Sequence, residues 1–277
     1  MHKDIEYAEL VLSVKQYYEQ KPHELRNIRN GDTLFDLVWC NELVDEINLW
    51  TYWQGAGVET PEVMIVGQDF GNCNDPFFEK CVRSKAKDRK NISEEYVHFI
   101  RSNKNNKTDN MLLELTEKGL GEQYSASAPS NKNLFMTNLC LGYRSVDRVS
   151  GGNLNAYLKH DSCYISKLIK IKKPKVVICL GMDTYFNLAS AFNVDKEALK
   201  DIAGGFWNLL DKGENYQQIQ QGDSDFRIYG VSHTGSNGSK NRKKNSKWKG
   251  TEKLSGKSLM MEDWKRIGEY LGEIKRI

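Results

Sequence analysis

The apolar run from Val63 to Val66 ends at Gly67, and the chain then presents Gln68 and Asp69 before a second glycine, Gly71. A short β-branched run bounded by glycine is typical of a buried strand that stops at a turn. The segment therefore predicts a strand that delivers polar side chains to the edge of a sheet. Ligand sites of α/β proteins lie at that edge.

Three later apolar runs end in a similar way, at residues 134–137 before Asn138, 175–180 before Gly181 and 226–232 before His233. Long segments with helical patterns separate the runs, and none of the connections forms a tight hairpin, so we expect parallel strands covered on both faces. The predicted fold is a three-layer α/β/α sandwich with a central four-stranded parallel sheet. Polar side chains that follow its strands would converge at one edge.

The spacing of apolar residues predicts helices over residues 5–18, 157–171, 183–192 and 260–274, with shorter helical pieces such as 111–118. No Pro-, Gly- or Ser-rich linker divides the apolar runs, so we expect a single domain over residues 1–277. Its expected parts are an N-terminal helical part (1–60), a core (61–240), a basic loop (240–258) and a C-terminal helix (259–277).

Neither the N-terminus nor any later segment has the long apolar stretch of a signal peptide or a membrane span. We therefore expect a cytoplasmic protein without a membrane partner, and a monomer. The six cysteines show no CxxC spacing, which argues against a disulfide framework and a zinc site. No cofactor is expected.

The formal net charge of +3 hides local clusters of basic residues. Residues 240–249 carry only positive charge, and a second basic stretch covers residues 80–90. Both stretches follow candidate site segments, which is the arrangement that a polyanion such as DNA requires. The expected DNA-binding residues are Ser236, Lys240, Arg242, Lys243, Lys244 and Lys247.

Four segments, taken in order, resemble the successive motifs of the uracil-DNA glycosylase superfamily. They are VMIVGQDFG at 63–71, NLFMTN at 133–138, KPKVVICLG at 173–181 and VSHTGS at 231–236. The resemblance covers about residues 60–240. It implies a four-stranded parallel sheet between helices, with a pocket at the carboxyl ends of the strands that receives a nucleotide flipped out of DNA.

The resemblance also implies roles for individual residues. Asp69 corresponds to the carboxylate that orients the attacking water and stabilises the developing oxocarbenium charge, and His233 to the histidine that supports negative charge on the leaving base. Asn138 corresponds to the amide that reads the pyrimidine, and Phe77 to the aromatic on which the base stacks. The expected base-binding residues are Gly67, Gln68, Phe70, Phe77 and Asn138.

The chemistry favours the same residue types. Hydrolysis of an N-glycosidic bond forms a cationic sugar and an anionic base, so a carboxylate and a hydrogen-bond donor on opposite sides stabilise charge only as it develops. An asparagine amide offers a donor and an acceptor together, which distinguishes uracil from cytosine.

The chain departs from the family pattern at two places. Phe70 and Gly71 stand where familiar members have Pro and a Tyr that excludes thymine, so we expect activity on 5-substituted uracils. No apolar wedge follows His233 closely, so we expect single-stranded or mismatched DNA to be preferred. Cys163 fits the iron–sulfur branch of the superfamily, but Cys40 and Cys140 do not fit its spacing. An iron–sulfur cluster is therefore the minor alternative to having no cofactor, and it would need Cys73 or Cys81 as substitute ligands.

The sequence thus predicts a monofunctional DNA glycosylase for uracil or a related damaged base, a DNA-repair hydrolase. One alternative is a catalytically silent glycosylase-like protein that binds nucleic acid with the same pocket. Another is a hydrolase of small nucleosides or nucleotides, for which the basic stretch would be superfluous.

Overall fold

The fold was analysed in a computed structural model of the chain. The structure describes residues 2–20, 28–30, 33–35, 37–38, 61–69, 98, 101–103, 106–125, 133–144, 154–201, 205–222, 224–247 and 253–276.

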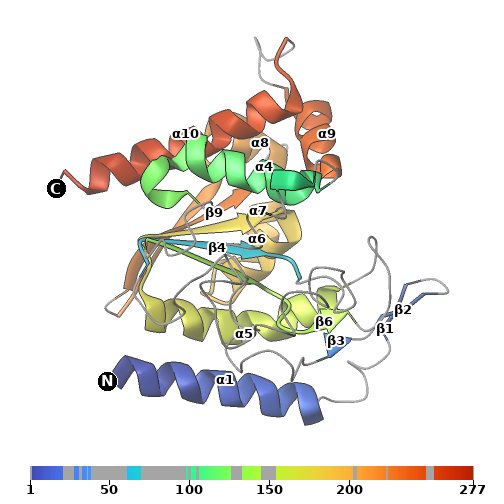
Figure 1. The fold of residues 1–277 in the computed structure, drawn as a ribbon, viewed down its shortest axis with the longest axis vertical. Coiled ribbons are helices and arrows are strands. Elements are labelled where there is room, and N and C mark those ends of the chain that lie inside the picture. The colour runs from blue at the N-terminus through green and yellow to red at the C-terminus, as the bar shows by residue number, and fades with distance from the viewer. Residues whose placement is uncertain are drawn as a thin grey trace.

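A five-stranded mixed sheet forms the centre of the molecule (Figure 1). Its strands follow the order β5 (Leu134–Asn138), β4 (Val63–Gly67), β7 (Val176–Leu180), β9 (Ser224–Val231) and β8 (Tyr216–Gln221). The first four are parallel to one another, whereas β8 pairs with β9 in the antiparallel direction. The α/β class is confirmed, but the expectation of a purely parallel four-stranded sheet is wrong.

The additional strand β8 escaped the sequence analysis because of its polar composition. Its sequence is YQQIQQ, and only Ile219 is buried, as suits an edge strand with little apolar surface to cover. Gln221 pairs with Ser224, which leaves the two residues Gly222 and Asp223 between the paired positions. Gly-Asp between two strands is a hairpin signal, and it was overlooked.

Helices cover both faces of the sheet (Figure 1). One face carries α1 (His2–Gln20), α5 (Asn155–Lys172), α6 (Met182–Ser190) and α8 (Gly205–Lys212), with α7 (Lys196–Asp201) between α6 and α8. The other carries α4 (Lys107–Leu115), the π-helical turn η4 (Thr116–Leu120) and α10 (Gly256–Ile274). A single 3₁₀ turn, η5 (Glu122–Tyr124), leads towards β5.

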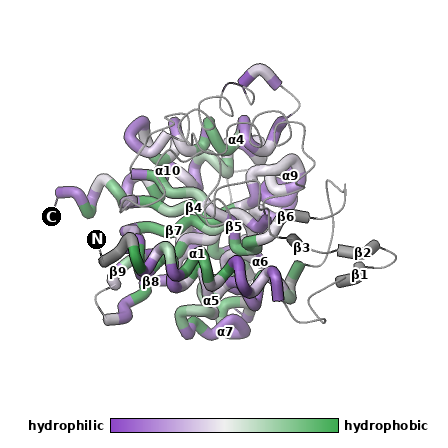
Figure 2. The backbone as a smooth tube through the Cα atoms, turned by 60° about the horizontal axis from the view of Figure 1, so that its bottom comes forward, coloured by the Kyte–Doolittle hydropathy of each residue, from purple (hydrophilic) through white to green (hydrophobic). Residues whose placement is uncertain are grey.

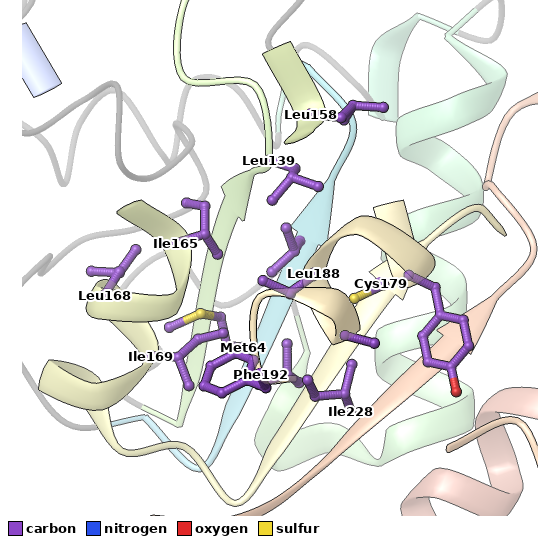
Figure 3. Close-up of a cluster of buried hydrophobic side chains, with 14 of the residues drawn as sticks. Met64, Leu139, Leu158, Ile165, Leu168, Ile169, Cys179, Leu188, Phe192 and Ile228 are labelled. Atoms are coloured by element: carbon purple, nitrogen blue, oxygen red, sulfur yellow. The ribbon is translucent and has the colours of Figure 1, made fainter. Parts of the chain in front are cut away.

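Alternating side chains of each strand enter two separate hydrophobic cores. In β4, Met64 and Val66 pack towards α5 and α6, whereas Val63 and Ile65 pack towards α4 and α10. Figure 3 shows the first of these cores, in which Met64 and Cys179 of the sheet meet Ile165 and Leu188 of the helices. This period of two is what a sheet buried on both faces requires.

The long helices lie where the apolar spacing predicted them, with boundaries that differ by a few residues. α1 alternates between hydrophobic and hydrophilic residues along its length (Figure 2). α5 ends at Lys172, and its cap Lys173 adopts a left-handed conformation (φ 52°) immediately before Pro174. Among the described residues, no helix has the length and apolar character needed to cross a membrane.

Two parts of the expected domain map differ from the structure. The N-terminal part contains the short strands β1 (Ile28–Asn30), β2 (Thr33–Phe35) and β3 (Leu37–Val38), so it is not helical throughout, and β3 pairs with β6 (Tyr143–Arg144). Residues 39–60 lie outside the described residues. Helix α9 (Ser236–Asn245) includes the first six residues of the expected basic loop (240–258). The C-terminal helix α10 starts at Gly256, three residues earlier than predicted.

Candidate functional site

The carboxyl ends of the four parallel strands bring the predicted site residues to one edge of the sheet. Gly67 at the end of β4 pairs directly with Asn138 at the end of β5. A Cβ atom added to Gly67 would lie 2.1 Å from Oδ1 of Asn138, so the amide of Asn138 rests against a position that only glycine can occupy. The absence of a side chain at Gly67 therefore leaves the space that the Asn138 side chain occupies at the end of β4.

The chain that follows β5 holds the end of β4 in place. Leu139 N–H donates to the carbonyl oxygen of Gly67 and Cys140 N–H donates to that of Gln68, both at 2.8 Å. The next amide, that of Leu141, donates to the buried carboxylate of Asp161 at 2.9 Å. Gln68 itself stays half-buried at this edge. These bonds continue the sheet pairing past its last residues and give the edge a rigid backbone.

His233 follows β9 at the same edge and is half-buried. Gly235 N–H donates to its Nδ1 at 3.0 Å, so Nδ1 acts as an acceptor and the neutral ring carries its proton on Nε2. Burial lowers the pKa of His233 below its ordinary value, and the negative charges of Asp69 and Asp109 oppose this shift without overcoming it. His233 is therefore a neutral imidazole with one N–H donor at neutral pH.

Asp69 lies two residues beyond β4 and is half-buried. β4 and β9 are separated by β7, and neighbouring strands lie about 4.8 Å apart, so Asp69 and His233 follow strands that are about 10 Å apart. β7 ends between them at Leu180, and the next residue, Gly181, has no side chain; a Cβ added there would lie 3.9 Å from Cβ of His233. The carboxylate and the imidazole thus stand on either side of a position without a side chain.

Several buried hydroxyl groups at this edge have no hydrogen-bond partner within the described part of the chain. They belong to Thr137 at the end of β5, and to Ser232 and Thr234 on either side of His233. Buried polar groups are normally satisfied. The hydroxyls of Thr137, Ser232 and Thr234 therefore leave hydrogen-bonding capacity unused at this edge of the sheet.

Helix α9 packs closely behind His233. A Cβ added to Gly238 would lie 1.7 Å from the carbonyl oxygen of His233, so only glycine allows the first turn of α9 to approach this residue. Ser236 is exposed at the start of this turn, and Lys240, Lys243 and Lys244 are exposed further along the helix. Their role in DNA binding stays a prediction, as does that of Lys247, which is also exposed.

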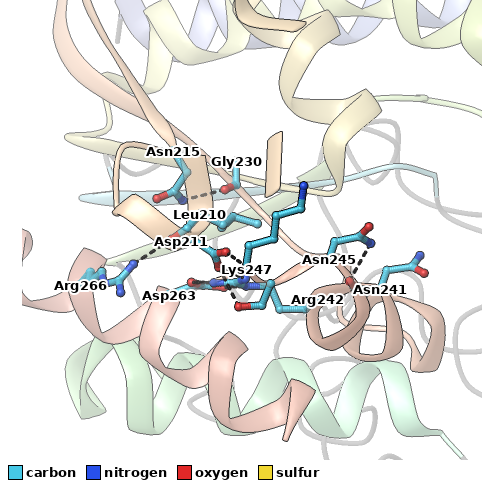
Figure 4. A network of polar contacts seen from close by, with 11 residues as sticks. Leu210, Asp211, Asn215, Gly230, Asn241, Arg242, Asn245, Lys247, Asp263 and Arg266 are labelled. Carbon is cyan, nitrogen blue, oxygen red and sulfur yellow. Dashed lines mark hydrogen bonds and ion pairs between the residues drawn. The ribbon is translucent and has the colours of Figure 1, made fainter. Parts of the chain in front are cut away.

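Arg242 does not fit the predicted role of a phosphate contact. Its side chain is 1% exposed and bonds Oδ1 of Asp211 at 2.6 Å and both carboxylate oxygens of Asp263 at 2.8 and 2.9 Å (Figure 4). The guanidinium group therefore joins α9 to α8 and α10, and it is a structural anchor rather than a DNA ligand. Ser246 Oγ and Lys247 N–H also donate to Asp211, at 3.0 and 2.7 Å.

Three other predictions fall outside the part of the chain that the structure describes. They concern the base-binding residues Phe70 and Phe77 and the basic stretch 80–90. Among the described cysteines, Cys140 and Cys179 are buried and Cys163 is exposed, and no disulfide joins any of these three. The described residues contain no group of three His, Cys, Asp or Glu side chains that could hold a metal ion.

The sequence analysis missed Asp109, which acts electrostatically on His233 from the first turn of α4. Asn106 caps this helix: its Oδ1 accepts a bond from the Asp109 N–H at 3.3 Å, and its Nδ2 donates to the Asp109 carboxylate at 2.7 Å. Asn followed three residues later by Asp is a helix-start signal, which would have placed a carboxylate at a helix N-terminus. Nothing local in the sequence places that terminus beside His233.

The chain was compared with protein-family models and with curated proteins, and neither comparison gave a match.

Proposed function

We propose that the protein is a monofunctional DNA glycosylase that hydrolyses the N-glycosidic bond of uracil or a related base in DNA. The observation that carries the proposal is that Asp69 and a neutral His233 follow parallel strands at the same edge of the sheet. The hydrogen bond from Gly235 and the burial of the ring keep His233 neutral and leave its Nε2–H available as a donor.

The two groups suit the two charges of the reaction. In the proposed step, the oxygen of a water molecule bonds to C1′ of the sugar, and the electron pair of the C1′–N bond leaves with the base. Asp69 orients this water, accepts its proton and stabilises the positive charge that develops on the sugar. His233 donates an Nε2–H hydrogen bond to the oxygen of the base on which negative charge develops. Such a donor contributes about 3–4 kcal/mol to the transition state.

Asn138 supplies recognition in this proposal. Its amide rests on Gly67 at the end of β4, where an acceptor oxygen and an N–H donor can meet the edge of a pyrimidine ring. Uracil presents a carbonyl oxygen and an N–H at that edge, whereas cytosine presents an amino group and a bare nitrogen. The fixed amide therefore favours uracil.

The experiment that tests the proposal incubates the protein with oligonucleotides that carry uracil, hypoxanthine, hydroxymethyluracil or a thymine mismatch, followed by alkali. Single- and double-stranded forms are compared. We expect alkali-labile breaks at uracil, and their loss in the Asp69→Asn variant. Asp201→Asn, an exposed aspartate at the end of α7, is the matched control and should retain the activity. Intact strands with every substrate would refute the proposal.

The exposed lysines of α9 favour a second candidate, a catalytically silent protein that binds nucleic acid. Lys240, Lys243 and Lys244 follow His233 closely and present positive charge at the surface. Under this candidate, the same oligonucleotides bind with a salt-dependent affinity but release no base.

A further inference from the structure

A hollow adjoins the His233 segment on the side of α4 and α10. Its volume is about 490 Å³, within the range of ordinary ligand pockets. Four basic side chains line it: Arg101, which precedes α4, Lys107 at the start of α4, Lys240 of α9 and Lys257 of α10. We refer to this hollow as the cationic pocket. Of these four, only Lys240 belongs to the basic stretch 240–249; Lys257 lies beyond its end, and Arg101 and Lys107 lie far from it along the chain.

The charges of the cationic pocket are far from balanced. Glu114 is the one acidic residue among its lining residues, and it bonds Lys257 at 2.6 Å and Lys118 at 3.3 Å. The hydrogen bond from Lys257 is the main reason why the pKa of Glu114 lies below its ordinary value. Within the described residues, Arg101, Lys107 and Lys240 have no carboxylate partner. Three like charges without a counter-charge around one hollow favour an anionic ligand.

Hydrogen-bond donors accompany these charges. Thr234 lines the cationic pocket and is 2% exposed, and its Oγ1 has no hydrogen-bond partner in the described part of the chain. The hydroxyl-bearing residues Ser236 and Ser239 also line the pocket. A buried hydroxyl without a partner beside several cations is a site that a ligand oxygen would satisfy.

The N-termini of two helices meet beside the cationic pocket. A Cβ added to Gly256, the first residue of α10, would lie 2.0 Å from the carbonyl oxygen of Ser239 in the first turn of α9. Gly235 caps α9 and, as a glycine, has no side chain that could accept a hydrogen bond from the first N–H groups of this helix. Helix N-termini carry partial positive charge and N–H donors, which adds to the attraction for an anion.

We propose that the cationic pocket binds a phosphate group. A tetrahedral, multiply charged anion matches several cations, hydroxyl donors and helix N-termini around one small volume. Gly235 connects this pocket to the proposed active site, because it lines the pocket and its N–H bonds Nδ1 of His233. The phosphate therefore belongs to the nucleotide that enters the active site or to its neighbour in the strand. That last assignment rests on the proposed function; the phosphate site itself does not.

The test measures binding rather than base release. The full chain and its Arg101→Gln/Lys107→Gln variant are titrated at low salt with inorganic phosphate, with deoxyuridine monophosphate and with a single-stranded oligonucleotide of unmodified bases. Both side chains are exposed, so the substitutions should leave the fold unchanged. Lys170→Gln is the matched control, because Lys170 is exposed in the last turn of α5 on the opposite face of the sheet.

We expect the double variant to weaken binding by about 10-fold or more, as the loss of charge-assisted hydrogen bonds predicts. An effect confined to the oligonucleotide identifies the ligand as a phosphodiester of a strand. An effect on the mononucleotide as well identifies a terminal phosphate. Unchanged affinity for all three probes, or an equal loss in the Lys170→Gln control, would overturn the phosphate site. Weaker binding in the double variant, together with intact strands in the separate assay of base release, would leave this site standing and refute only the proposed function.

Discussion

Replacing Arg242 with methionine tests whether this residue is a structural anchor rather than a contact for DNA. Arg242 makes three hydrogen bonds, of 2.6, 2.8 and 2.9 Å, to the carboxylates of Asp211 and Asp263. These carboxylates are 8% and 2% exposed. Methionine fills much of the same volume but leaves both carboxylates buried without their cation.

Loss of one partner of a buried ion pair costs about 3–5 kcal/mol, because the remaining charge is uncompensated. We therefore expect the Arg242→Met variant to lose about this much free energy of unfolding at pH 7. With a urea dependence of about 3 kcal/mol per M, the unfolding midpoint would fall by about 1–2 M. Urea unfolding followed by circular dichroism measures this shift.

The deficit should also depend on pH. Burial raises the pKa of Asp263 even beside Arg242, and without the arginine the effect of burial on the pKa of both carboxyl groups meets less opposition. A carboxyl group whose pKa is higher in the folded state favours folding at low pH, and this contribution is lost as the pH rises through that pKa. The deficit of the variant is therefore larger at pH 7 than near pH 4.

The control is Lys244→Met, two residues further along α9, where the side chain is exposed. Surface substitutions of this kind change stability by about 0.5 kcal/mol or less. An Arg242→Met variant that is as stable as this control would show that Arg242 is not an anchor, and would return it to the set of DNA-binding candidates.

Three further predictions concern the site. Gly67→Ala should displace the Asn138 side chain, because the added Cβ would lie 2.1 Å from its Oδ1; we expect uracil to lose its advantage over cytosine in competition assays, and unchanged discrimination would contradict the contact. The rate of base release should fall only as the pH drops below about 6.5, because protonated Nδ1 of His233 can no longer accept the Gly235 N–H; a pH–rate profile that falls at higher pH would show that another group titrates. The Lys243→Gln/Lys244→Gln variant should flatten the slope of log affinity against log salt on single-stranded DNA by up to about 1.4, and an unchanged slope would remove this face of α9 from the DNA-binding surface.

The strands that carry the site were predictable because their apolar runs are short, β-branched and bounded by glycine or polar residues. The same reasoning placed Asp69, Asn138 and His233 at one edge, since the carboxyl ends of parallel strands meet there. The edge strand β8 carries a polar sequence, so hydrophobic periodicity could not reveal it, and only its Gly-Asp turn gave a signal.

The role of Arg242 could not be predicted from the local sequence. It lies in a uniformly basic stretch, and its partners are 31 and 21 residues away along the chain. Helix α9 lacks an apolar stripe because its buried residues are Gly238 and Arg242, four positions apart on one face. The buried positions have the four-residue spacing that is typical of a helix. They are occupied, however, by a glycine and by an arginine whose charge is neutralised only in the folded state.

The cationic pocket, like the role of Arg242, could not be predicted from the local sequence. Arg101, Lys107 and Lys257 are separate basic residues in the sequence, and only the packing of α4, α9 and α10 brings them together with Lys240. Charge clusters formed by distant segments have no sequence signature. Runs of basic residues in the sequence therefore indicate the exposed lysines of α9 but not the cationic pocket beside them.

The central claim is that Asp69 and His233 act together on one glycosidic bond, and single-turnover release of uracil from a single-stranded oligonucleotide tests it most directly. We predict measurable release by the parent protein and a loss of about 100-fold or more in both Asp69→Asn and His233→Ala. Residues that act as a unit are not additive, so the double variant should be little slower than the slower single variant. Release that survives undiminished in either single variant, or its absence in a parent protein that binds the oligonucleotide, would contradict the claim.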